Sequence, residues 1–417
     1  MQDVIGEAGK TPQGDRSIEV TQHGNRPAAA PNFCIGRIAN QGEDAVAADQ
    51  PGKGAAGHIP AADDQDFLHR GILADNEGKQ MSYRITVTPS GKSFDADPDE
   101  TVLSAALRQG LVLPYGCRDG ACGSCKGKVV CGEIEDGKAK PPALSDADRA
   151  AGFTLFCCAF AQSDLTLECK TVRAANDIPV KTLPTRIEKL ERLAPDVIEL
   201  HLRLPASERL QFLAGQYVDI LLKDGKRRSF SMANAPHDDA FLQLHIRHVP
   251  GGLFTDQVFS TLKVRDILRI NGPHGSFTLR EESEKPMVLV AGGTGFAPIK
   301  SLVEHAFHEA CQRPMVLYWG AKAKTDLYQD DLPLRWAAKH PQFRYVPVLS
   351  EARPEDRWNG RSGLVHAAVM ADFPDLSGYE VYACGAPAMI EAARRDFTVG
   401  CCLPEEAFFS DAFTFSN

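Results

Sequence analysis

The chain has no hydrophobic run long enough to cross a membrane. Its longest apolar runs, such as residues 287–291, have the length of a buried strand, whereas a membrane-spanning helix needs roughly 18 apolar residues. The sequence also lacks internal repeats, a secretory signal peptide and a stripe of basic residues, and its net charge is −9. These absences argue against membrane insertion and against nucleic acid as the main partner. We expect a cytoplasmic protein of about three domains in its 417 residues.

Aromatic residues and a sustained apolar period are scarce in residues 1–80, which are rich in Ala, Gly, Asp, Gln and Pro. Such a composition does not supply a packed core. At Met81 the sequence changes to alternating strand residues. Residues 77–80 also require a purine-rich coding stretch just before the Met81 codon, as a bacterial ribosome-binding site would. We interpret residues 1–80 as a disordered tail or a mis-assigned start, with a regulatory or docking tail as the alternative.

Four of the twelve cysteines have the spacing of iron–sulfur ligands. Cys117, Cys122 and Cys125 lie in YGCRDGACGSC, and Cys157 follows in TLFCCAF. Three thiolates on a glycine-rich loop and a fourth from a distant strand suit a [2Fe-2S] cluster, in which each iron takes two protein sulfurs. The alternative is a structural zinc site, but such sites usually contain two close cysteine pairs. A disulfide framework is not expected in a long chain without a signal peptide.

The segments around the cysteines are typical of a ferredoxin. Residues 81–96 predict two strands joined by a glycine turn, and a helix should follow with Asp97 as its N-cap and Gly110 after its end. Residues 81–172 resemble the β-grasp ferredoxin module of bacterial flavin and iron–sulfur reductases. The family pattern Leu-x-Cys-x-Ala implies Cys157, not the adjacent Cys158, as the fourth ligand. Both cannot bind, because adjacent residues of an extended segment point in opposite directions.

A strand-rich region, expected at residues 182–282 after a linker around residues 171–184, predicts a small barrel. The run Arg228-Ser229-Phe230-Ser231 resembles the flavin motif of the ferredoxin-NADP reductase superfamily. A guanidinium can bind the FAD pyrophosphate, an aromatic ring can pack against the isoalloxazine, and the Ser231 hydroxyl can hydrogen-bond near flavin N5. Without its context, this run would be read as an ordinary exposed strand.

The segment LHIRHVPGGLFTDQVF predicts a strand, a Gly-Gly turn and a helix start that offers N–H groups to a phosphate. In the superfamily the FAD pyrophosphate is bound here. By resemblance, the cofactor-binding residues are His245, Ile246 and Arg247 before the turn, and Gly252, Leu253, Phe254 and Thr255 in and after it.

A buried strand at residues 287–291, a glycine turn and a helix predict the nucleotide-binding geometry of a doubly wound sheet at residues 285–417. The spacing is not the dinucleotide fingerprint GxGxxG. In the superfamily this domain binds the pyridine nucleotide, which implies binding roles for Gly293, Thr294 and Gly295. The resemblance also implies that Cys384 and Gly385 lie beside the nicotinamide.

Related reductases end in an acidic residue, a spacer and an aromatic residue that covers the flavin. These positions correspond to Asp411 and Phe413, although four residues follow Phe413 here, and core packing is the alternative for that ring. The resemblance therefore implies Ser231, Cys384 and Asp411 as the catalytic group.

The predicted fold is a multidomain α+β and α/β chain: a β-grasp ferredoxin, a small antiparallel FAD-binding β-barrel, and a doubly wound parallel-sheet NAD-binding domain. It most resembles the CDP-6-deoxy-glucoseen reductase-like members of the ferredoxin-NADP reductase superfamily. This implies electron transfer from NADH, or possibly NADPH, through FAD and [2Fe-2S] to a partner protein. Two kinds of electron-acceptor protein are candidates: a deoxysugar dehydrase and an oxygenase component. A redox sensor or carrier is the alternative of another class, but it would not need the complete flavin and nucleotide set.

Overall fold

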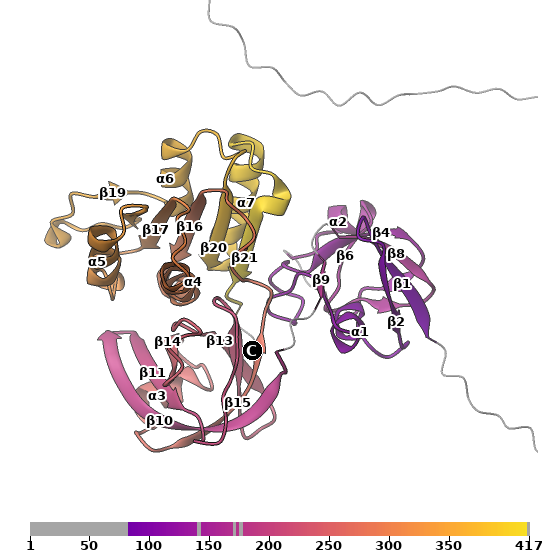
Figure 1. Cartoon of the computed structure of the whole chain (residues 1–417), viewed down its shortest axis with the longest axis horizontal. Helices are drawn as coiled ribbons and strands as arrows, with labels where there is room; N and C mark the ends of the chain where they lie inside the picture. Colours follow the sequence, from indigo (N-terminus) through magenta and orange to yellow (C-terminus); the bar gives the residue numbers. More distant parts are fainter. Residues whose placement is uncertain (1–81, 140–142, 170–171, 175–177, 415–417) are drawn as a thin grey trace, which may run out of the picture. The chain divides into compact units, whose positions relative to one another are not determined.

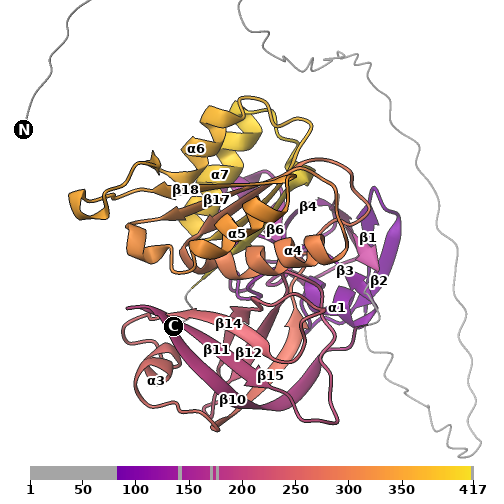
Figure 2. The ribbon, with the colours of Figure 1, turned by 60° about the vertical axis from the view of Figure 1, so that its left-hand side comes forward.

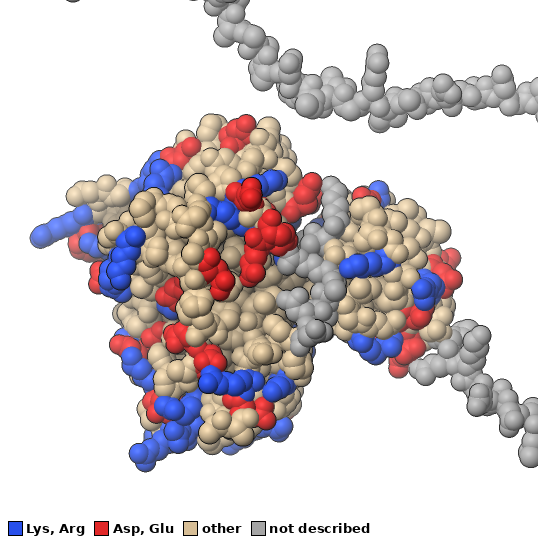
Figure 3. All heavy atoms as spheres, in the orientation of Figure 1, with Lys and Arg blue, Asp and Glu red and all other residues tan. Residues whose placement is uncertain are grey.

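The computed structural model describes residues 82–139, 143–169, 172–174 and 178–414 (Figure 1). The interpretation of residues 1–80 as a tail or mis-assigned start lies outside this range. No helix in the described part is long and apolar enough to span a membrane. The strands form three main sheets. On the face shown in Figure 3, basic and acidic side chains are mixed rather than gathered into separate patches.

The first sheet is mixed and carries the cysteine loop. Its five strands follow the order β2-β1-β8-β4-β6, and helix α1 packs buried Val102, Leu103, Ala105 and Ala106 into its core. The bounds are β1 Tyr83–Thr88, β2 Lys92–Ala96, α1 Val102–Arg108, β4 Lys126–Cys131, β6 Phe153–Leu155 and β8 Leu165–Glu168. Shorter elements are β3 Leu111–Val112 paired with β9 Arg173–Ala174, β5 Ile134–Glu135 paired with β7 Phe160–Ala161, and α2 Asp146–Ala150. This is the predicted β-grasp fold.

Helix α1 begins four residues later than the sequence suggested. Its N-cap is Thr101, whose hydroxyl accepts the Ser104 N–H at 3.2 Å. The predicted cap, Asp97, instead opens a turn in which its N–H donates to Glu100 Oε1 at 3.0 Å. A Thr cap closer to the first buried residue, Val102, starts the helix where its apolar face begins.

The second sheet is a closed antiparallel barrel (Figure 2). Its order is β13-β12-β15-β10-β11-β14, and a bridge between Met232 and Leu244 joins the two outer strands. The bounds are β10 Lys181–Ala194, β11 Val197–Arg203, β12 Tyr217–Leu221, β13 Arg227–Ser231, β14 Leu242–Arg247, α3 Thr255–Ser260 and β15 Ile267–His274. Alternate residues such as Val218, Ile220 and Leu244 fill its core.

Strand β10 starts at Lys181, inside the segment expected to be a linker, and contains Pro184. A proline usually indicates irregular chain, because it has no N–H to donate to a sheet. In the barrel, Pro184 lies opposite Arg269 of β15, and β11 joins β10 only from Arg186 onward. The proline therefore occupies an edge position, where strands tolerate it.

The third sheet is wholly parallel, in the order β19-β18-β17-β16-β20-β21. Its strands are β16 Met287–Gly292, β17 Met315–Ala321, β18 Phe343–Leu349, β19 Arg361–Ser362, β20 Glu380–Gly385 and β21 Phe408–Ala412. The helices are α4 Phe296–His308, α5 Asp331–Lys339, α6 Val365–Asp372 and α7 Pro387–Gly400, and the short 3₁₀ turns are η1 Gly293–Gly295, η2 Lys324–Asp326, η3 Pro354–Asp356 and η4 Glu405–Ala407.

Helices cover both faces of this sheet. Leu289 of β16 packs with α4 and α5 in one core, whereas its neighbours Val288 and Val290 pack with α6 and α7 in another. The strand order runs outward from β16 in one direction and from β20 in the other. The switch point between β16 and β20 is where doubly wound sheets bind nucleotides.

Candidate functional site

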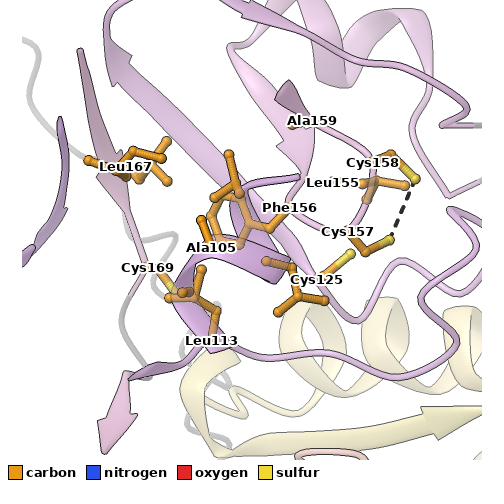
Figure 4. Close-up of a cluster of buried hydrophobic side chains, with 14 of the residues drawn as sticks. Ala105, Leu113, Cys125, Leu155, Phe156, Cys157, Cys158, Ala159, Leu167 and Cys169 are labelled. Atoms are coloured by element: carbon orange, nitrogen blue, oxygen red, sulfur yellow. Dashed lines mark hydrogen bonds between the residues drawn. The ribbon is translucent and has the colours of Figure 1, made fainter. Parts of the chain in front are cut away.

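The cysteine loop joins β3 to β4 and brings the four predicted ligands together as two pairs. Cys122 Sγ accepts the Cys117 N–H at 3.4 Å, and the Cys122 thiol lowers the pKa of Cys117 to about 6 by hydrogen bonding. In the second pair, hydrogen bonds from the thiols of Cys125 and then Cys158 lower the pKa of Cys157 to about 3. In Figure 4 the Cys125 sulfur points toward Cys157, whose own sulfur is joined by a dashed line to that of Cys158. Two sulfur pairs match the needs of two irons.

The backbone around these sulfurs leaves little room. A Cβ on Gly116 would lie 3.2 Å from Ser124 Oγ and 3.3 Å from Cys122 Sγ, and one on Gly120, with φ +73°, would lie 2.7 Å from Cys158 Sγ. The buried Ser124 hydroxyl lies beside Cys122, where its hydrogen bonding favours the thiolate, although no Ser124 contact within the described residues has ordinary hydrogen-bond geometry. A glycine cradle and a buried hydroxyl beside a ligand thiol fit a cluster whose sulfides accept hydrogen bonds.

The geometry at Cys158 differs from the expectation: Cys157 and Cys158 lie in a turn rather than an extended segment, so their side chains do not point in opposite directions. Cys158 is buried with its sulfur 3.6 Å from that of Cys157 (Figure 4). Cys169 is buried in the same core, and Cys131 is exposed on β4.

The flavin motif occupies β13 with its side chains on alternate faces. The Phe230 ring packs against the barrel core, with its centroid 5.4 Å from that of the Phe254 ring. Half-buried Arg228 lies on the same face, and its guanidinium donates to the Arg227 carbonyl at 2.8 Å. On the other face, Ser231 is buried and the Ser229 hydroxyl donates to Asp219 at 2.6 Å. The structure thus directs Ser229 toward a protein carboxylate.

The three predicted residues of β14 differ in what they can reach. The His245 side chain is fully buried, with Nδ1 3.0 Å from the Tyr328 hydroxyl and Nε2 3.5 Å from Glu199. Burial lowers the pKa of His245, although the neighbouring Glu199 acts in the opposite direction. Ile246 packs inside the barrel. Of the three, only Arg247 extends to the nucleotide turn at Gly293–Gly295, where its guanidinium lies 3.6 Å from a Cβ built on Gly293.

The Gly-Gly turn is tightly closed. Gly251 has φ +80°, and a Cβ on Gly252 would lie 2.5 Å from Thr255 Oγ1. The Thr255 hydroxyl donates to the Val249 carbonyl at 2.9 Å, Phe254 is buried in the barrel core, and Leu253 is exposed. The side chains of Phe254 and Thr255 are therefore engaged within the protein, and a phosphate would meet this turn through its backbone.

The predicted catalytic residues come together from two sheets. Cys384 of β20 lies opposite Asp411 of β21, and the Ser231 hydroxyl of β13 lies 3.5 Å from Asp411 Oδ2. All three are buried. Burial, followed by the negative charge of Cys117, raises the pKa of Asp411 to about 7, and burial also raises the pKa of Cys384. This carboxyl can hold or release a proton near neutral pH, beside a hydroxyl and a neutral thiol.

The nucleotide turn lies at the switch point of the parallel sheet. Gly293, Thr294 and Gly295 form η1, and a Cβ on Gly295 would lie 2.1 Å from the Cys384 carbonyl. Gly385 has φ +153°, and its carbonyl accepts the Phe413 N–H at 2.8 Å. The half-buried Phe413 ring packs against the core of this domain, which was the alternative for it.

The barrel side chains that contact the cysteine loop were not among the residues predicted from the sequence. Tyr217 Oη donates to the Gly116 carbonyl at 2.7 Å, Ser276 Oγ donates to the Tyr115 carbonyl at 2.9 Å, and Asp219 forms an ion pair with Arg118. Spacing rules do not connect residues this far apart. The one local signal is Asp219 itself, an acidic residue within an otherwise apolar strand.

Comparison with known proteins decides the family. Residues 85–162 match the 2Fe-2S iron-sulfur cluster binding domain, 184–279 the oxidoreductase FAD-binding domain and 289–395 the oxidoreductase NAD-binding domain. The chain is 44% identical over 333 residues to the CDP-6-deoxy-L-threo-D-glycero-4-hexulose-3-dehydrase reductase of Yersinia pestis, covering 80% of this chain and 99% of that protein. The chain belongs to the ferredoxin-NADP reductase superfamily, as an iron–sulfur flavoprotein reductase.

Other members of the superfamily are oxygenase reductases. The phenol 2-monooxygenase reductase component DmpP of Pseudomonas sp. is 36% identical, over 80% of this chain and 95% of that protein. The crystal structure of Amycolatopsis cytochrome P450 reductase GcoB aligns with a TM-score of 0.65 and 34% identity, over 80% of this chain and 100% of that one.

The predicted fold, cofactors and enzyme class are therefore confirmed. The chain is an NAD(P)H-dependent oxidoreductase with a [2Fe-2S] cluster and FAD, and it transfers electrons to an acceptor protein.

Proposed function

We propose that this reductase delivers electrons from NADH to a dehydrase that acts on CDP-6-deoxy-L-threo-D-glycero-4-hexulose. The observation that carries the proposal is the 44% identity across 99% of the Yersinia pestis dehydrase reductase. An oxygenase component is the second candidate acceptor, because reductases of phenol and terephthalate oxygenases are 36% and 37% identical to the chain. The higher identity and nearly complete coverage favour the dehydrase.

In this proposal the cluster-binding domain spans residues 81–172, and its ligands are Cys117 and Cys122 on one iron and Cys125 and Cys157 on the other. The two sulfur pairs support this assignment. The glycine cradle and the Ser124 hydroxyl support it independently, because they offer space and a hydrogen-bond donor to inorganic sulfide.

The flavin site occupies the barrel, residues 182–282, and the nucleotide site residues 285–417. Bound FAD supplies the conversion of a two-electron hydride into single electrons. Arg228 would bind its pyrophosphate and Phe230 would pack against its ring, while Ser231 and Asp411 would hold a proton near N5. The other proposed FAD contacts are Ser229 and Arg247, the turn residues Gly252 and Leu253, Phe413, and the backbone of His245, Ile246, Phe254 and Thr255, whose side chains are engaged within the protein.

In this proposal the nicotinamide enters between the FAD-binding barrel and the NAD-binding domain. Gly293, Thr294 and Gly295 receive the nucleotide phosphates through their backbone, and Cys384 with Gly385 borders the nicotinamide. The neutral thiol of Cys384, fully buried beside Asp411, keeps water away from the position of hydride transfer.

The partner can be tested by reconstitution under anaerobic conditions. The chain, NADH, the dehydrase and its CDP-hexulose substrate are mixed, and NADH oxidation is compared with product formation. We expect about one NADH per product, with no turnover when the dehydrase is omitted or when the Cys122→Ser reductase is used. Coupled turnover with a phenol oxygenase component, and none with the dehydrase, would overturn the proposal in favour of the second candidate.

A separate prediction concerns the choice of nucleotide. NADPH-specific relatives carry an arginine where Glu351 follows Ser350 at the end of β18, and a carboxylate there repels the 2′-phosphate. Two nearby cations reduce this repulsion: Lys322, which is paired with Glu351 at 3.3 Å, and Arg353. We expect kcat/KM for NADH to exceed that for NADPH by about tenfold or more, equivalent to ~1.4 kcal/mol. Glu351→Arg should narrow or reverse the ratio, and a wild-type preference for NADPH would refute the prediction.

A further inference from the structure

The cysteine loop lies along one face of strands β12 and β13. In the antiparallel register Tyr217 is opposite Ser231 and Asp219 is opposite Ser229, so these four side chains share a face. Tyr217 donates a hydrogen bond to the carbonyl of Gly116, the residue before Cys117. Asp219 pairs with the side chain of Arg118, the residue after Cys117. A proposed cluster ligand is thus fixed on both sides by the strand that pairs with the flavin motif.

Within this contact, the Arg118–Asp219 pair is built differently from an ordinary surface ion pair. The side chains are 19% and 2% exposed, whereas those of the neighbouring Arg227–Asp119 pair are 38% and 35% exposed. Exposed pairs contribute little because water and salt screen them, but removing one partner of a buried pair leaves an uncompensated charge. The buried pair therefore holds the loop more firmly than the exposed one.

Asp219 is also the point where the two cofactor segments meet. Its Oδ2 pairs with Arg118 on the cysteine loop, and its Oδ1 accepts the hydroxyl of Ser229 in the flavin motif at 2.6 Å. The nearby His274 does not compete as a cation, because burial and the charge of Arg118 lower its pKa to about 4. One carboxylate thus connects the residue after Cys117 to the strand of Arg228 and Ser231.

The backbone at Arg118 indicates that its position is imposed. Its φ is +60°, in the left-handed region that side chains other than glycine rarely adopt. Such a conformation persists only where surrounding contacts determine it. Here those contacts are the ion pair with Asp219 and the Arg118 guanidinium over the Tyr217 ring at 5.8 Å.

We propose that the buried Arg118–Asp219 pair is a positioning device for electron transfer: it fixes the cluster-binding loop against the flavin-motif strand and so sets the rate at which single electrons pass from flavin to cluster. Each passage removes one electron from the flavin and adds one to the cluster, and no bond is made or broken between them. The rate of such a step falls steeply with distance, so a small displacement of the loop has a large effect.

The test measures the two reduction steps separately. Arg118→Gln and Asp219→Asn are mixed anaerobically with NADH in a stopped-flow instrument, with flavin and cluster absorbance followed at the same time. In both variants we expect cluster reduction to slow by about tenfold or more, equivalent to ~1.4 kcal/mol of barrier. In Arg118→Gln, flavin reduction by NADH should keep its wild-type rate. The matched control, Asp119→Asn, removes the exposed pair with Arg227 but leaves the charges around Asp219 in place, and it should stay within about twofold of wild type. Arg118→Lys should recover part of the lost rate.

A positioning role is distinguished from electrostatic tuning by the direction of the potential shifts. Losing the Arg118 cation should lower the midpoint potential of the cluster, and losing the Asp219 charge should raise it. Because Asp219 also lies beside the flavin motif, the flavin potential is measured too; if driving force controlled the step, Asp219→Asn would transfer electrons faster than wild type wherever the cluster potential rises more than that of the flavin. Slower transfer in both variants supports positioning, whereas faster transfer in Asp219→Asn, or unchanged rates in both, overturns it.

The inference rests on Cys117 being a cluster ligand, so cluster content is measured in every variant by electron paramagnetic resonance. Wild-type-like spectra from Cys117→Ser would refute the ligand assignment itself. Intact clusters with unchanged electron transfer in the Arg118 and Asp219 variants would refute only the positioning role. If Arg118→Gln does not retain its cluster, Asp219→Asn, whose substitution lies outside the loop, decides the question.

Discussion

Cys157→Ser is expected to abolish the native [2Fe-2S] signal in electron paramagnetic resonance, while Cys158→Ser should retain it. Cys157 forms the second sulfur pair with Cys125, and hydrogen bonds from Cys125 and Cys158 lower its pKa to about 3, which favours the thiolate that binds iron. The Cys158 sulfur is buried against Gly120, which leaves space for it, because a Cβ there would lie only 2.7 Å away.

Iron and sulfide content per chain should likewise fall in Cys157→Ser and stay near the wild-type level in Cys158→Ser. The Cys158→Ser protein serves as the control, because it makes the same chemical change one residue away at a position that is also buried. If Cys158→Ser lost the cluster and Cys157→Ser retained it, the fourth ligand would be Cys158, and the pairing of sulfurs described above would be wrong.

The second large effect concerns the order of electron transfer. Cys122→Ser should lower cytochrome c reduction by at least about tenfold, ~1.4 kcal/mol of barrier, because that acceptor receives its electrons from the cluster. Ferricyanide reduction should persist, because ferricyanide can take electrons from the flavin directly. Arg228→Ala should weaken both activities, since losing the pyrophosphate contact lowers FAD occupancy, and both cytochrome c and ferricyanide depend on electrons from the flavin.

Both variants are assayed with NADH as the donor, and their FAD content is measured so that rates can be expressed per flavin. Undiminished cytochrome c reduction by a cluster-free, FAD-replete Cys122→Ser protein would mean that the flavin reduces that acceptor itself. The ferredoxin domain would then serve another purpose, such as docking the partner.

Features that depend on neighbours in sequence could be predicted from it. The cysteine spacing encodes ligands on a single loop, and the buried run before Gly293 encodes a parallel strand and its turn. The start of α1 was wrong by four residues because two capping patterns, at Asp97 and at Thr101, lie side by side. Local rules do not rank such alternatives, and the buried face that begins at Val102 decides between them.

Features that depend on tertiary contacts could not be predicted. Family position alone assigned His245 and Ile246 to the cofactor, but their side chains are buried against Tyr328 and inside the barrel. The Arg118–Asp219 pair joins residues 101 positions apart, and only the docking of the cysteine loop on β12 brings them together. Charge complementarity over that distance leaves no pattern in a single sequence.

The most direct test of the account is the anaerobic reduction of the wild-type protein by NADH, followed by stopped-flow absorbance and freeze-quench electron paramagnetic resonance. The account predicts that flavin absorbance bleaches first and that the signal of a reduced [2Fe-2S] cluster then appears, at a rate no faster than flavin reduction. A protein that remains colourless after reconstitution with iron, sulfide and FAD would contradict it. So would cluster reduction by NADH in protein stripped of flavin.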